Sequence, residues 1–419
     1  MKATSLRVFV IALAVGLWGT APTVGQAPGA RPWVTAWATS QQALGDARIT
    51  NATVRMIARV TAPGDAVRIR IDNTFGTEAV IIGRASIGHR VRGGVLAAGS
   101  NRPLAFAGKT EAVVPAGGTI MSDSVQLKVL AHQDLAVSLY VPGANVRPSQ
   151  HTNAVVTSYR TEDGKGDAAG DESGAPFSVT TTATWWLKSI DVQSTATSSA
   201  IVAFGDSITD GTCSTLDAHD RWEDVLSLRM VLQHDAESRA ARGARPPLLA
   251  VVNEGIGGNT LMREGLAEPP VSDPALERLE RDVLSHHGVS DVVLFMGTND
   301  LRRGATASRV IDATTSIIQK VKAKGFRIVG ATIIPRHNAP PGPGTSGWDA
   351  HKTAFRNEVN QWIRTKAPFD RVIDFEAAVR DPGNRDQIVP AFNCGDGVHP
   401  SPAGYFEIGK SIDLSLFKR

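Results

Sequence analysis

The second half of the chain alternates short apolar runs with amphipathic helical segments, and this alternation restricts the fold more than any other feature. From about Ser198 onward, strands are predicted at residues 200–204, 248–253, 291–295, 327–334 and 371–375. Helices are predicted near residues 222–242, 274–286, 307–324, 351–366 and 402–416. Alternating β and α units favour a parallel sheet with right-handed crossovers and helices on both faces. We therefore expect a three-layer α/β/α domain with a five-stranded parallel sheet.

In the first half of the chain the apolar residues recur with a different period. From Trp33 to about Val192, apolar and polar residues alternate along runs such as 67–72, 125–129 and 135–141. Period-two alternation predicts half-buried strands, and glycine and proline turn signals separate these runs. This half is expected to be an antiparallel β-sandwich, jelly-roll-like in form, with residues 161–174 as a surface loop or a mobile excursion. The expected organisation is a signal segment with a linker over residues 1–30, a sandwich domain over 31–195 and an α/β domain over 196–419.

The first thirty residues have the layout of a secretory signal. Lys2 and Arg7 precede an apolar stretch at residues 8–18, which small and polar residues follow at 19–30. This stretch is too short to span a bilayer; the alternative is a retained N-terminal membrane anchor. No later run approaches the roughly 18 apolar residues that a membrane helix needs. A soluble mature protein without integral membrane association, secreted or periplasmic, is therefore expected.

Charge and cysteine content exclude several kinds of partner. The 44 basic and 41 acidic residues leave a formal net charge of +3, which is too even to favour nucleic acid or an anionic membrane surface. No C-x-x-C or H-E-x-x-H run is present, so the sequence predicts no metal site, and it indicates no cofactor. In an exported protein the two cysteines, Cys213 and Cys394, are expected to be bonded to each other. The alternative is two unrelated buried thiols, because a disulfide needs Cα atoms within about 7 Å.

Polar or glycine-rich clusters follow four of the five predicted strands. Gly205-Asp206-Ser207 follows the first strand, residues 253–259 follow the second, and residues 297–300 follow the third. Asp396 and His399 come after the last strand and a longer excursion. Ligands bind outside the carboxyl ends of the strands in an open α/β sheet, so these clusters should meet at one edge.

These clusters contain the groups that a serine nucleophile needs. Serine is a weak nucleophile unless a base lies within hydrogen-bond reach and a third group orients that base. An aspartate three residues before a histidine can turn back onto Nδ1 and leave Nε2 for the serine proton. We therefore predict that Ser207 is the nucleophile, His399 the base and Asp396 the orienting acid. A Cys213–Cys394 disulfide would then tie the serine loop to the histidine loop.

A serine that attacks an ester also needs donors for the negative charge that develops on oxygen. The candidates are the backbone N–H of Ser207, the backbone N–H of Gly258 and the side-chain amide of Asn299. A glycine lets the backbone approach a substrate closely. Gly257 directly precedes Gly258, so the loop offers two glycines for this role.

The motifs resemble those of the SGNH (GDSL-type) hydrolase family. Gly-Asp-Ser-Ile at 205–208, the glycine loop at 253–259, Gly-Thr-Asn-Asp at 297–300 and Asp-Gly-Val-His at 396–399 occur in the family's order. Ile208 stands where the family usually has leucine. The resemblance implies a flavodoxin-like catalytic domain, the nucleophile at Ser207, the oxyanion donors at Ser207, Gly258 and Asn299, and the acid and base at Asp396 and His399. The segments 33–38 and 72–76 are similar, more faintly, to the β-sandwich of some exported members.

The family acts on lipid, aryl and carbohydrate esters, so the reaction is better defined than the substrate. We expect a secreted esterase for short-acyl, especially acetyl, esters of carbohydrates or for small aryl and alkyl esters. The alternatives are a lipase or lysophospholipase for longer chains, an acyltransferase, and a non-catalytic polysaccharide-binding protein. Asp206 and Asp300 are expected to brace a turn and to cap a helix. Further candidates, each with a structural role as the alternative, fall into three groups. His219, His337 and His351 are candidates to line the pocket, Arg302 and Arg303 to meet an anionic substrate, and Trp185, Trp186 and Trp348 to form a sugar-stacking platform.

Overall fold

The computed structural model describes residues 31–240, 247–336 and 347–418. The expected signal segment at residues 1–30 and the pocket candidate His337 lie outside these ranges. Each predicted strand of the second half is present in one parallel sheet, at the bounds β18 (Thr197–Gly205), β19 (Leu248–Gly255), β20 (Val289–Phe295), β21 (Arg327–Ala331) and β22 (Arg371–Ile373). The strand order is β19-β18-β20-β21-β22. This is the flavodoxin-like order 2-1-3-4-5, which confirms the predicted fold class.

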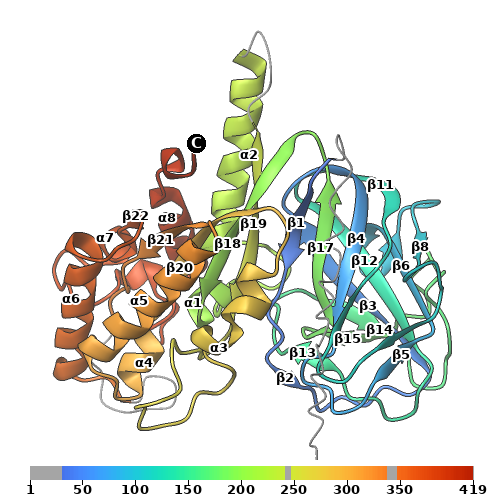
Figure 1. Cartoon of the computed structure of the whole chain (residues 1–419), viewed down its shortest axis with the longest axis horizontal. Helices are drawn as coiled ribbons and strands as arrows, with labels where there is room; N and C mark the ends of the chain where they lie inside the picture. The colour runs from blue at the N-terminus through green and yellow to red at the C-terminus, as the bar shows by residue number, and fades with distance from the viewer. Residues whose placement is uncertain (1–30, 241–246, 337–346, 419) are drawn as a thin grey trace, which may run out of the picture. The chain divides into compact units, whose positions relative to one another are not determined.

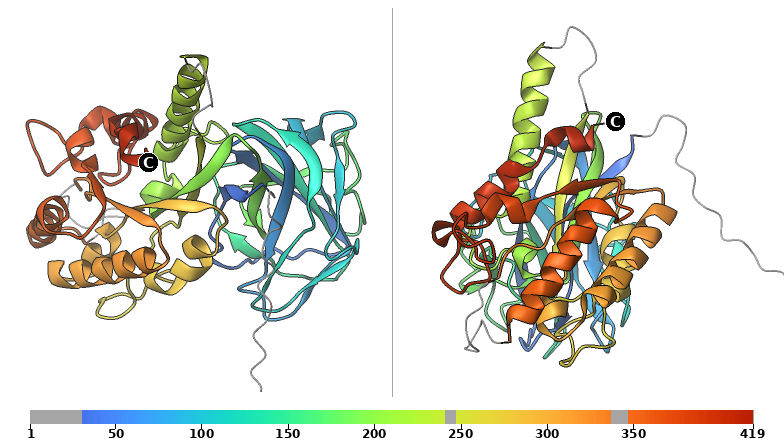
Figure 2. Two further views of the ribbon diagram at one scale, coloured as in Figure 1. Left: turned by 45° about the horizontal axis from the view of Figure 1, so that its top comes forward. Right: turned by 90° about the vertical axis from the view of Figure 1, so that its left-hand side faces the viewer.

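Helices cover both faces of this sheet, as Figure 1 and Figure 2 show. Along β18, Ile201 and Ala203 pack in one core with helices α2 (Trp222–Ala240), α7 (Phe375–Val379) and α8 (Pro402–Ser411). Val202 and Phe204 pack in a second core with α3 (Ala275–Leu279), α5 (Ala307–Ala323) and α6 (Ala350–Thr365). Successive strand residues point to opposite faces, so continuously apolar strands produce two cores and three layers.

Three features differ from the predicted elements. The strand predicted at 327–334 ends at Ala331, because the backbone of Ile333 is hydrogen-bonded to the Asn360 side chain and not to a neighbouring strand. Asn360 accepts from the Ile333 N–H and donates to the Ile333 carbonyl, both at 2.8 Å. Phe375 begins α7 instead of ending a strand, since Asp374 caps the helix by accepting from the Ala377 N–H at 3.1 Å. The helix predicted at 274–286 consists of α3 followed by a π-helical turn, Glu280–Leu284.

The first half forms antiparallel sheets, as predicted. One main sheet contains β1 (Trp33–Ala38), β4 (Gly64–Asp72), β10 (Thr119–Met121), β11 (Val125–Val129) and β17 (Leu187–Gln193). The other contains β3 (Ala52–Val60), β6 (Arg84–Arg92), β7 (Val95–Leu96), β8 (Arg102–Leu104), β12 (Gln133–Val141), β14 (Ser158–Arg160) and β15 (Val179–Thr181). Two small sheets pair β2 (Ala43–Leu44) and β16 (Thr184–Trp185) with β13 (Ser149–His151), and β5 (Val80–Ile82) with β9 (Ala112–Val114). The alternating residues Val67, Ile69 and Ile71 are fully buried.

The polar run at residues 161–174 lies against the second main sheet. Arg55 donates to the carbonyl of Asp171 at 2.6 Å, and the Ser86 hydroxyl donates to the carbonyl of Ala169 at 2.6 Å. Trp185, Trp186 and Trp348 are only 5%, 0% and 3% exposed. The suggestion of a sugar-stacking tryptophan platform is therefore wrong, because these rings fill the core.

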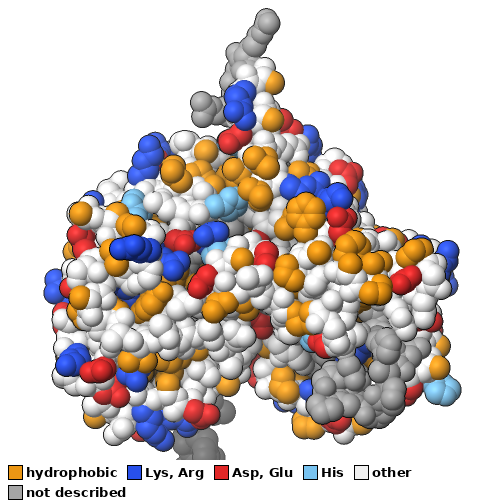
Figure 3. Space-filling view, turned by 180° about the vertical axis from the view of Figure 1, so that it is seen from behind, with side chains coloured by type: hydrophobic (Ala, Val, Ile, Leu, Met, Phe, Trp, Pro, Cys, Tyr) orange, Lys and Arg blue, Asp and Glu red, His pale blue; other side chains and the backbone are white. Residues whose placement is uncertain are grey.

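Strand β1 joins the two halves of the chain. It pairs with β17 in the sandwich and also contacts β18 and β19 of the parallel sheet. The Thr35 N–H donates to the carbonyl of His287 at 3.0 Å, and one apolar core runs from the sandwich to α2 and α8. No helix in the described part of the chain combines the length and apolar character needed to cross a bilayer. On the face shown in Figure 3, acidic and basic side chains are interspersed.

Candidate active site

Ser207 lies at the tight turn that leaves β18. It is the first residue of a one-turn helix, α1 (Ser207–Asp210), and Asp206 caps that helix by accepting from the Ile208 N–H at 3.0 Å. Gly205 must lack a side chain here, because a Cβ atom would collide with Thr209. The serine side chain therefore stands at the carboxyl end of the sheet, and the residue is 7% exposed. Asp206 braces this turn, as expected.

Ser207, His399 and Asp396 form one hydrogen-bonded chain. The distance from Ser207 Oγ to His399 Nε2 is 2.8 Å, and that from His399 Nδ1 to Asp396 Oδ2 is 2.5 Å. The second carboxylate oxygen of Asp396 accepts the backbone N–H groups of Val398 and His399, both at 2.8 Å. Burial favours a raised pKa for Asp396, but the hydrogen bonds from His399 and Val398 and the charge of His399 together outweigh it and lower the pKa to about 2. Asp396 is thus held as a carboxylate facing the imidazole.

The loop that carries His399 is held by hydrogen bonds within the loop and by a disulfide. Asn393 donates to the carbonyl of His399 at 3.0 Å, and its side-chain oxygen accepts the N–H groups of Gly395 and Gly397. Cys394 is bonded to Cys213, and their Cα atoms lie 6.3 Å apart. This disulfide joins the segment after α1 to the histidine loop, as expected from the spacing of the two cysteines.

The loop after β19 presents one glycine N–H without a protein partner. The N–H of Gly257 donates to Asp210 Oδ2 at 2.7 Å. The N–H of Gly258 has no acceptor among the described residues, and neither has that of Ser207. Gly258 has a φ of +72°, a left-handed conformation that favours glycine. The structure therefore distinguishes the two glycines, and Gly258 has the free donor.

Asn299 and Asp300 begin the short helix α4 (Thr298–Arg302) after β20 and reach across to the same loop. Asn299 Nδ2 donates to the Asn259 carbonyl at 3.0 Å, which leaves its second amide proton available. The Asp300 carboxyl accepts from Leu261 and Met262 N–H groups at 2.9–3.3 Å, so it fastens this loop and does not cap its own helix. Burial raises the pKa of Asp300 to about 7.

Other pocket candidates are engaged elsewhere. Arg303 is buried and donates to the carbonyl of Pro269 at 2.6 Å, and Arg302 pairs with Glu268 at 3.3 Å. His351 is exposed in the first turn of α6, and His219 lies 4.0 Å from Asp134 of the sandwich. None of these four side chains is bonded to Ser207, His399 or Asn299.

Sequence reasoning missed residues that support the site. His151, on β13 of the sandwich, lies 2.9 Å from Asp210 Oδ1, and Arg278 on α3 contacts the loops that follow β18 and β19. A lone histidine in a β-region and an arginine in a helix carry no local signal. Asp210 is 59 residues from His151, and Gly205 and Ser40 are 73 and 238 residues from Arg278.

One group of potential metal ligands occurs among the described residues, namely Cys213, Cys394 and Asp396 within 4.8 Å of one another. Both sulfur atoms belong to the disulfide, and Asp396 is hydrogen-bonded to His399. The group is therefore explained by the bonds of the histidine loop.

The second half of the chain matches a known protein family. Residues 203–405 match the model of the GDSL-like Lipase/Acylhydrolase family, and all the site motifs named above lie inside this range. Among curated protein sequences, none matches this chain significantly.

Three solved structures illustrate the likeness. A GDSL-like lipase from Bacteroides thetaiotaomicron is 18% identical and covers 52% of this chain and 88% of its own, with a TM-score of 0.36. A carbohydrate acetylesterase from Sinorhizobium meliloti is 14% identical, with 50% and 94% covered and a TM-score of 0.38. An aryl esterase from M. smegmatis is 16% identical, with 51% and 95% covered and a TM-score of 0.37.

The family match and the motif order therefore lead to the same assignment. The chain carries, at residues 203–405, a domain of the GDSL-like lipase/acylhydrolase family, and the chain is an ester hydrolase.

Proposed function

We propose that this protein is an exported serine esterase that works through a Ser207–His399–Asp396 triad and an acyl-enzyme intermediate. The observation that carries the proposal is the hydrogen-bonded chain of these side chains, with 2.8 Å between Ser207 Oγ and His399 Nε2. At these distances a serine, a histidine and an aspartate can act as nucleophile, base and orienting acid, respectively.

In the proposed reaction these groups first form an acyl-enzyme and then hydrolyse it. Ser207 Oγ bonds to the ester carbonyl carbon while its proton passes to His399 Nε2. The carbonyl oxygen becomes an oxyanion, which the N–H groups of Ser207 and Gly258 and the free amide proton of Asn299 stabilise. The tetrahedral intermediate expels the alcohol, which takes the proton from His399. A water molecule then loses a proton to His399 and attacks the acyl carbon. The bond from that carbon to Ser207 Oγ breaks, Oγ takes the proton back from His399, and the acid is released.

A cleft beside the oxyanion loop supports a small ester with a polar alcohol. Its volume is about 340 Å³, near the lower end of the range for small-molecule sites. The catalytic half supplies Asp210, Thr212, Ile256, Gly257, Val271 and Ser272, and the sandwich supplies Gln42, Ala43, Thr152, Asn153 and Val155. Five hydroxyl or amide side chains, those of Gln42, Thr152, Asn153, Thr212 and Ser272, lie among apolar ones in this lining. They offer hydrogen-bond partners to the hydroxyl groups of a carbohydrate alcohol, which supports acetyl esters of carbohydrates. We propose the sandwich, residues 31–195, as an accessory domain that forms one wall of this cleft.

Export is supported by the Cys213–Cys394 disulfide, since structural disulfides persist in oxidising compartments. The signal segment at residues 1–30 remains part of this proposal.

The test is hydrolysis of p-nitrophenyl esters from acetate to palmitate, and of an acetylated oligosaccharide, by the wild type and by Ser207→Ala. We expect activity that is highest on acetate and that Ser207→Ala abolishes. A preference for palmitate would favour the lipase alternative. Product esters formed when an alcohol acceptor is added would favour acyl transfer. A folded wild-type protein that hydrolyses no ester and does not react with a serine-directed phosphonate would overturn the proposal in favour of a polysaccharide-binding protein.

A further inference from the structure

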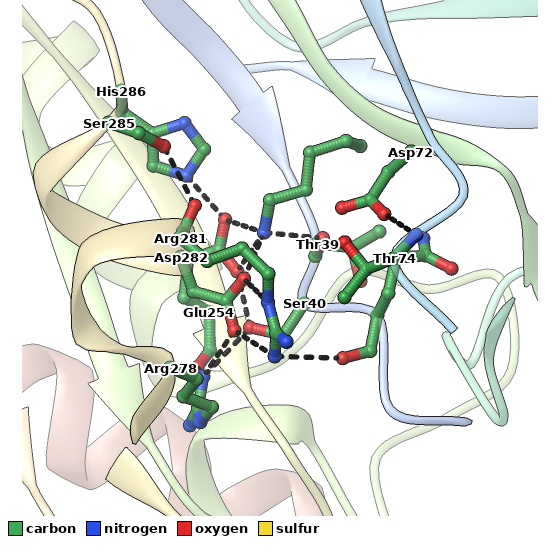
Figure 4. Close-up of polar contacts among 12 residues, drawn as sticks. Thr39, Ser40, Asp72, Thr74, Glu254, Arg278, Arg281, Asp282, Ser285 and His286 are labelled. Atoms are coloured by element: carbon green, nitrogen blue, oxygen red, sulfur yellow. Dashed lines mark hydrogen bonds and ion pairs between the residues drawn. The ribbon is translucent and has the colours of Figure 1, made fainter. Parts of the chain in front are cut away.

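A buried cluster of charged side chains joins the sandwich to the strand ends that carry the active site (Figure 4). Lys188 of β17 donates to the Thr39 carbonyl at 3.1 Å, to Glu254 at 3.1 and 3.2 Å, and to Asp282 at 2.7 Å. Glu254 lies in β19, one residue before its end, and Asp282 in the π-helical turn after α3. The four residues Lys188, Glu254, Arg278 and Asp282 are at most 1% exposed and carry two positive and two negative charges. A buried charge is tolerated only when it is paired. Lys188 of the sandwich therefore needs Glu254 and Asp282 of the second half as partners, and these carboxylates need Lys188.

Arg278 is the member of this cluster that reaches the active-site loops. Its guanidinium donates to the Gly205 carbonyl at 2.9 Å, to the Glu254 carbonyl at 2.9 Å and to Asn259 Oδ1 at 3.0 Å. One rigid, planar group thereby holds the end of β18, the end of β19 and the loop between Gly255 and Asn259.

Each of these contacts lies next to a proposed oxyanion donor. Gly205 is two residues before Ser207, and Asn259 directly follows Gly258. The carbonyl of Asn259 in turn accepts from the Asn299 side chain at 3.0 Å. The relative positions of the three donors therefore depend on the orientation of one side chain.

The sandwich holds that side chain through Ser40, just after β1. Ser40 Oγ accepts from Arg278 Nη1 at 2.8 Å and donates to the Glu254 carboxylate. The Ser40 carbonyl accepts from His151 Nδ1 at 2.8 Å, and His151 Nε2 meets Asp210, which holds the Gly257 N–H. Ser40 thus connects to the oxyanion loop from two directions.

We propose that Arg278 is a positioning residue for the oxyanion hole and that Ser40 makes the β-sandwich an integral part of the catalytic centre. This inference rests on the proposed roles of Gly258 and Asn299. A purely structural contact between the halves would change stability but would leave the turnover of the folded enzyme unchanged. A positioning role moves kcat, because misplacing a catalytic group by about 1 Å can cost about 10²-fold in rate.

The first test compares Arg278→Lys with Arg281→Lys. Arg281 bonds to this cluster through Asp282 and also donates to Asp273 and the Gln41 carbonyl, but it donates to none of Gly205, Glu254 and Asn259. Lysine keeps the charge in both variants but cannot make the planar fork of contacts. We expect kcat for p-nitrophenyl acetate to fall about 10²-fold in Arg278→Lys with KM changed less than about threefold, and to stay within about twofold of the wild type in Arg281→Lys. Equal effects on kcat in the two folded variants would overturn the inference.

The second test removes two sandwich hydroxyls that both bond to the catalytic half. Ser40→Ala loses the contacts to Arg278 and Glu254. Thr61→Val loses a bond from the Val251 N–H, at 3.0 Å in the middle of β19, and one to the Ala36 carbonyl at 2.9 Å, neither of which is next to a proposed oxyanion donor. Losing one positioning hydrogen bond should lower kcat about tenfold in Ser40→Ala and leave it nearly unchanged in Thr61→Val. This pair keeps the inference testable if Arg278→Lys does not fold, and an unchanged kcat in Ser40→Ala would overturn it.

The readout that isolates the oxyanion hole is the affinity for an alkyl boronic acid, which forms a tetrahedral anion on the serine. Affinity should fall in Arg278→Lys and Ser40→Ala in parallel with kcat/KM, and it should be unchanged in Arg281→Lys and Thr61→Val. An affinity that does not follow kcat/KM would contradict positioning of the oxyanion donors. A wild-type enzyme with no esterase activity would instead remove the proposed function itself, so the two failures are distinguishable.

Discussion

The carboxylate of Asp210 accepts the N–H of Gly257 at 2.7 Å and meets His151 of the sandwich at 2.9 Å through its other oxygen. The neighbouring N–H, on Gly258, consequently remains available to a substrate. The side chain at the end of α1 therefore determines which of two adjacent glycine N–H groups is left without an acceptor among the described residues. The same carboxylate connects that choice to the sandwich.

Replacing Asn299 by alanine should lower kcat by about 10²–10³ with little change in KM, because the amide proton acts mainly on the charge that develops in the transition state. Steady-state kinetics on p-nitrophenyl acetate measure the effect. Labelling by a phosphonate would verify that Ser207 is still folded and reactive. An unchanged kcat would exclude Asn299 from the mechanism.

Substitutions in the sandwich wall of the cleft should alter the choice of alcohol. We expect Gln42→Ala combined with Asn153→Ala to raise KM for an acetylated oligosaccharide about fivefold, the usual effect of one lost hydrogen bond, while KM for p-nitrophenyl acetate stays the same. Gln126→Ala, on the exposed side of β11, is the matched control. If both substrates respond equally, the sandwich does not contact the alcohol.

The disulfide should stabilise the folded chain by closing a long loop. Cys213 and Cys394 are separated by 181 residues, for which the chain-entropy model gives about 5 kcal/mol. A reductant should therefore lower the melting temperature of the wild type and leave the Cys213→Ser, Cys394→Ser double variant unaffected. Identical melting of the wild type with and without reductant would show that the bond contributes nothing.

The His151–Asp210 pair should give a pH-dependent part of the stability. Burial favours a lowered pKa for His151, but the facing Asp210 carboxylate and the hydrogen bond to the Ser40 carbonyl together outweigh it and raise the pKa above its usual 6.5, while Arg221 opposes the rise. Because the folded-state pKa is the higher one, the stabilisation is complete below pH 6.5 and is lost as the pH rises through the folded-state pKa.

Urea unfolding of the wild type and His151→Gln at several pH values measures this effect. The wild type's advantage in unfolding free energy should be largest below pH 6.5 and should shrink at higher pH. An advantage that grows with pH would contradict the sign of the pKa shift.

Much of the fold could be predicted because strands and helices leave periodic traces in the sequence. The continuous apolar run at 200–204 is a strand buried on both faces, and the alternation at 67–72 is a strand of the sandwich. The one-turn helices α1 and α4 were not predicted, because four or five residues are too few for a helical period. Trp185, Trp186 and Trp348 were ambiguous, since an aromatic side chain suits a core as well as a sugar platform.

The sequence by itself determined the chemistry that the chain can perform, because Ser207, Asn299, Asp396 and His399 lie in local motifs that follow strands of one parallel sheet. Only the tertiary structure decided which glycine N–H remains free and what holds it in place. Those answers come from Ser40, His151, Asp210 and Arg278, whose partners are distant in the chain. Hydrogen bonds between such residues arise from packing, and packing leaves no periodic pattern along the sequence.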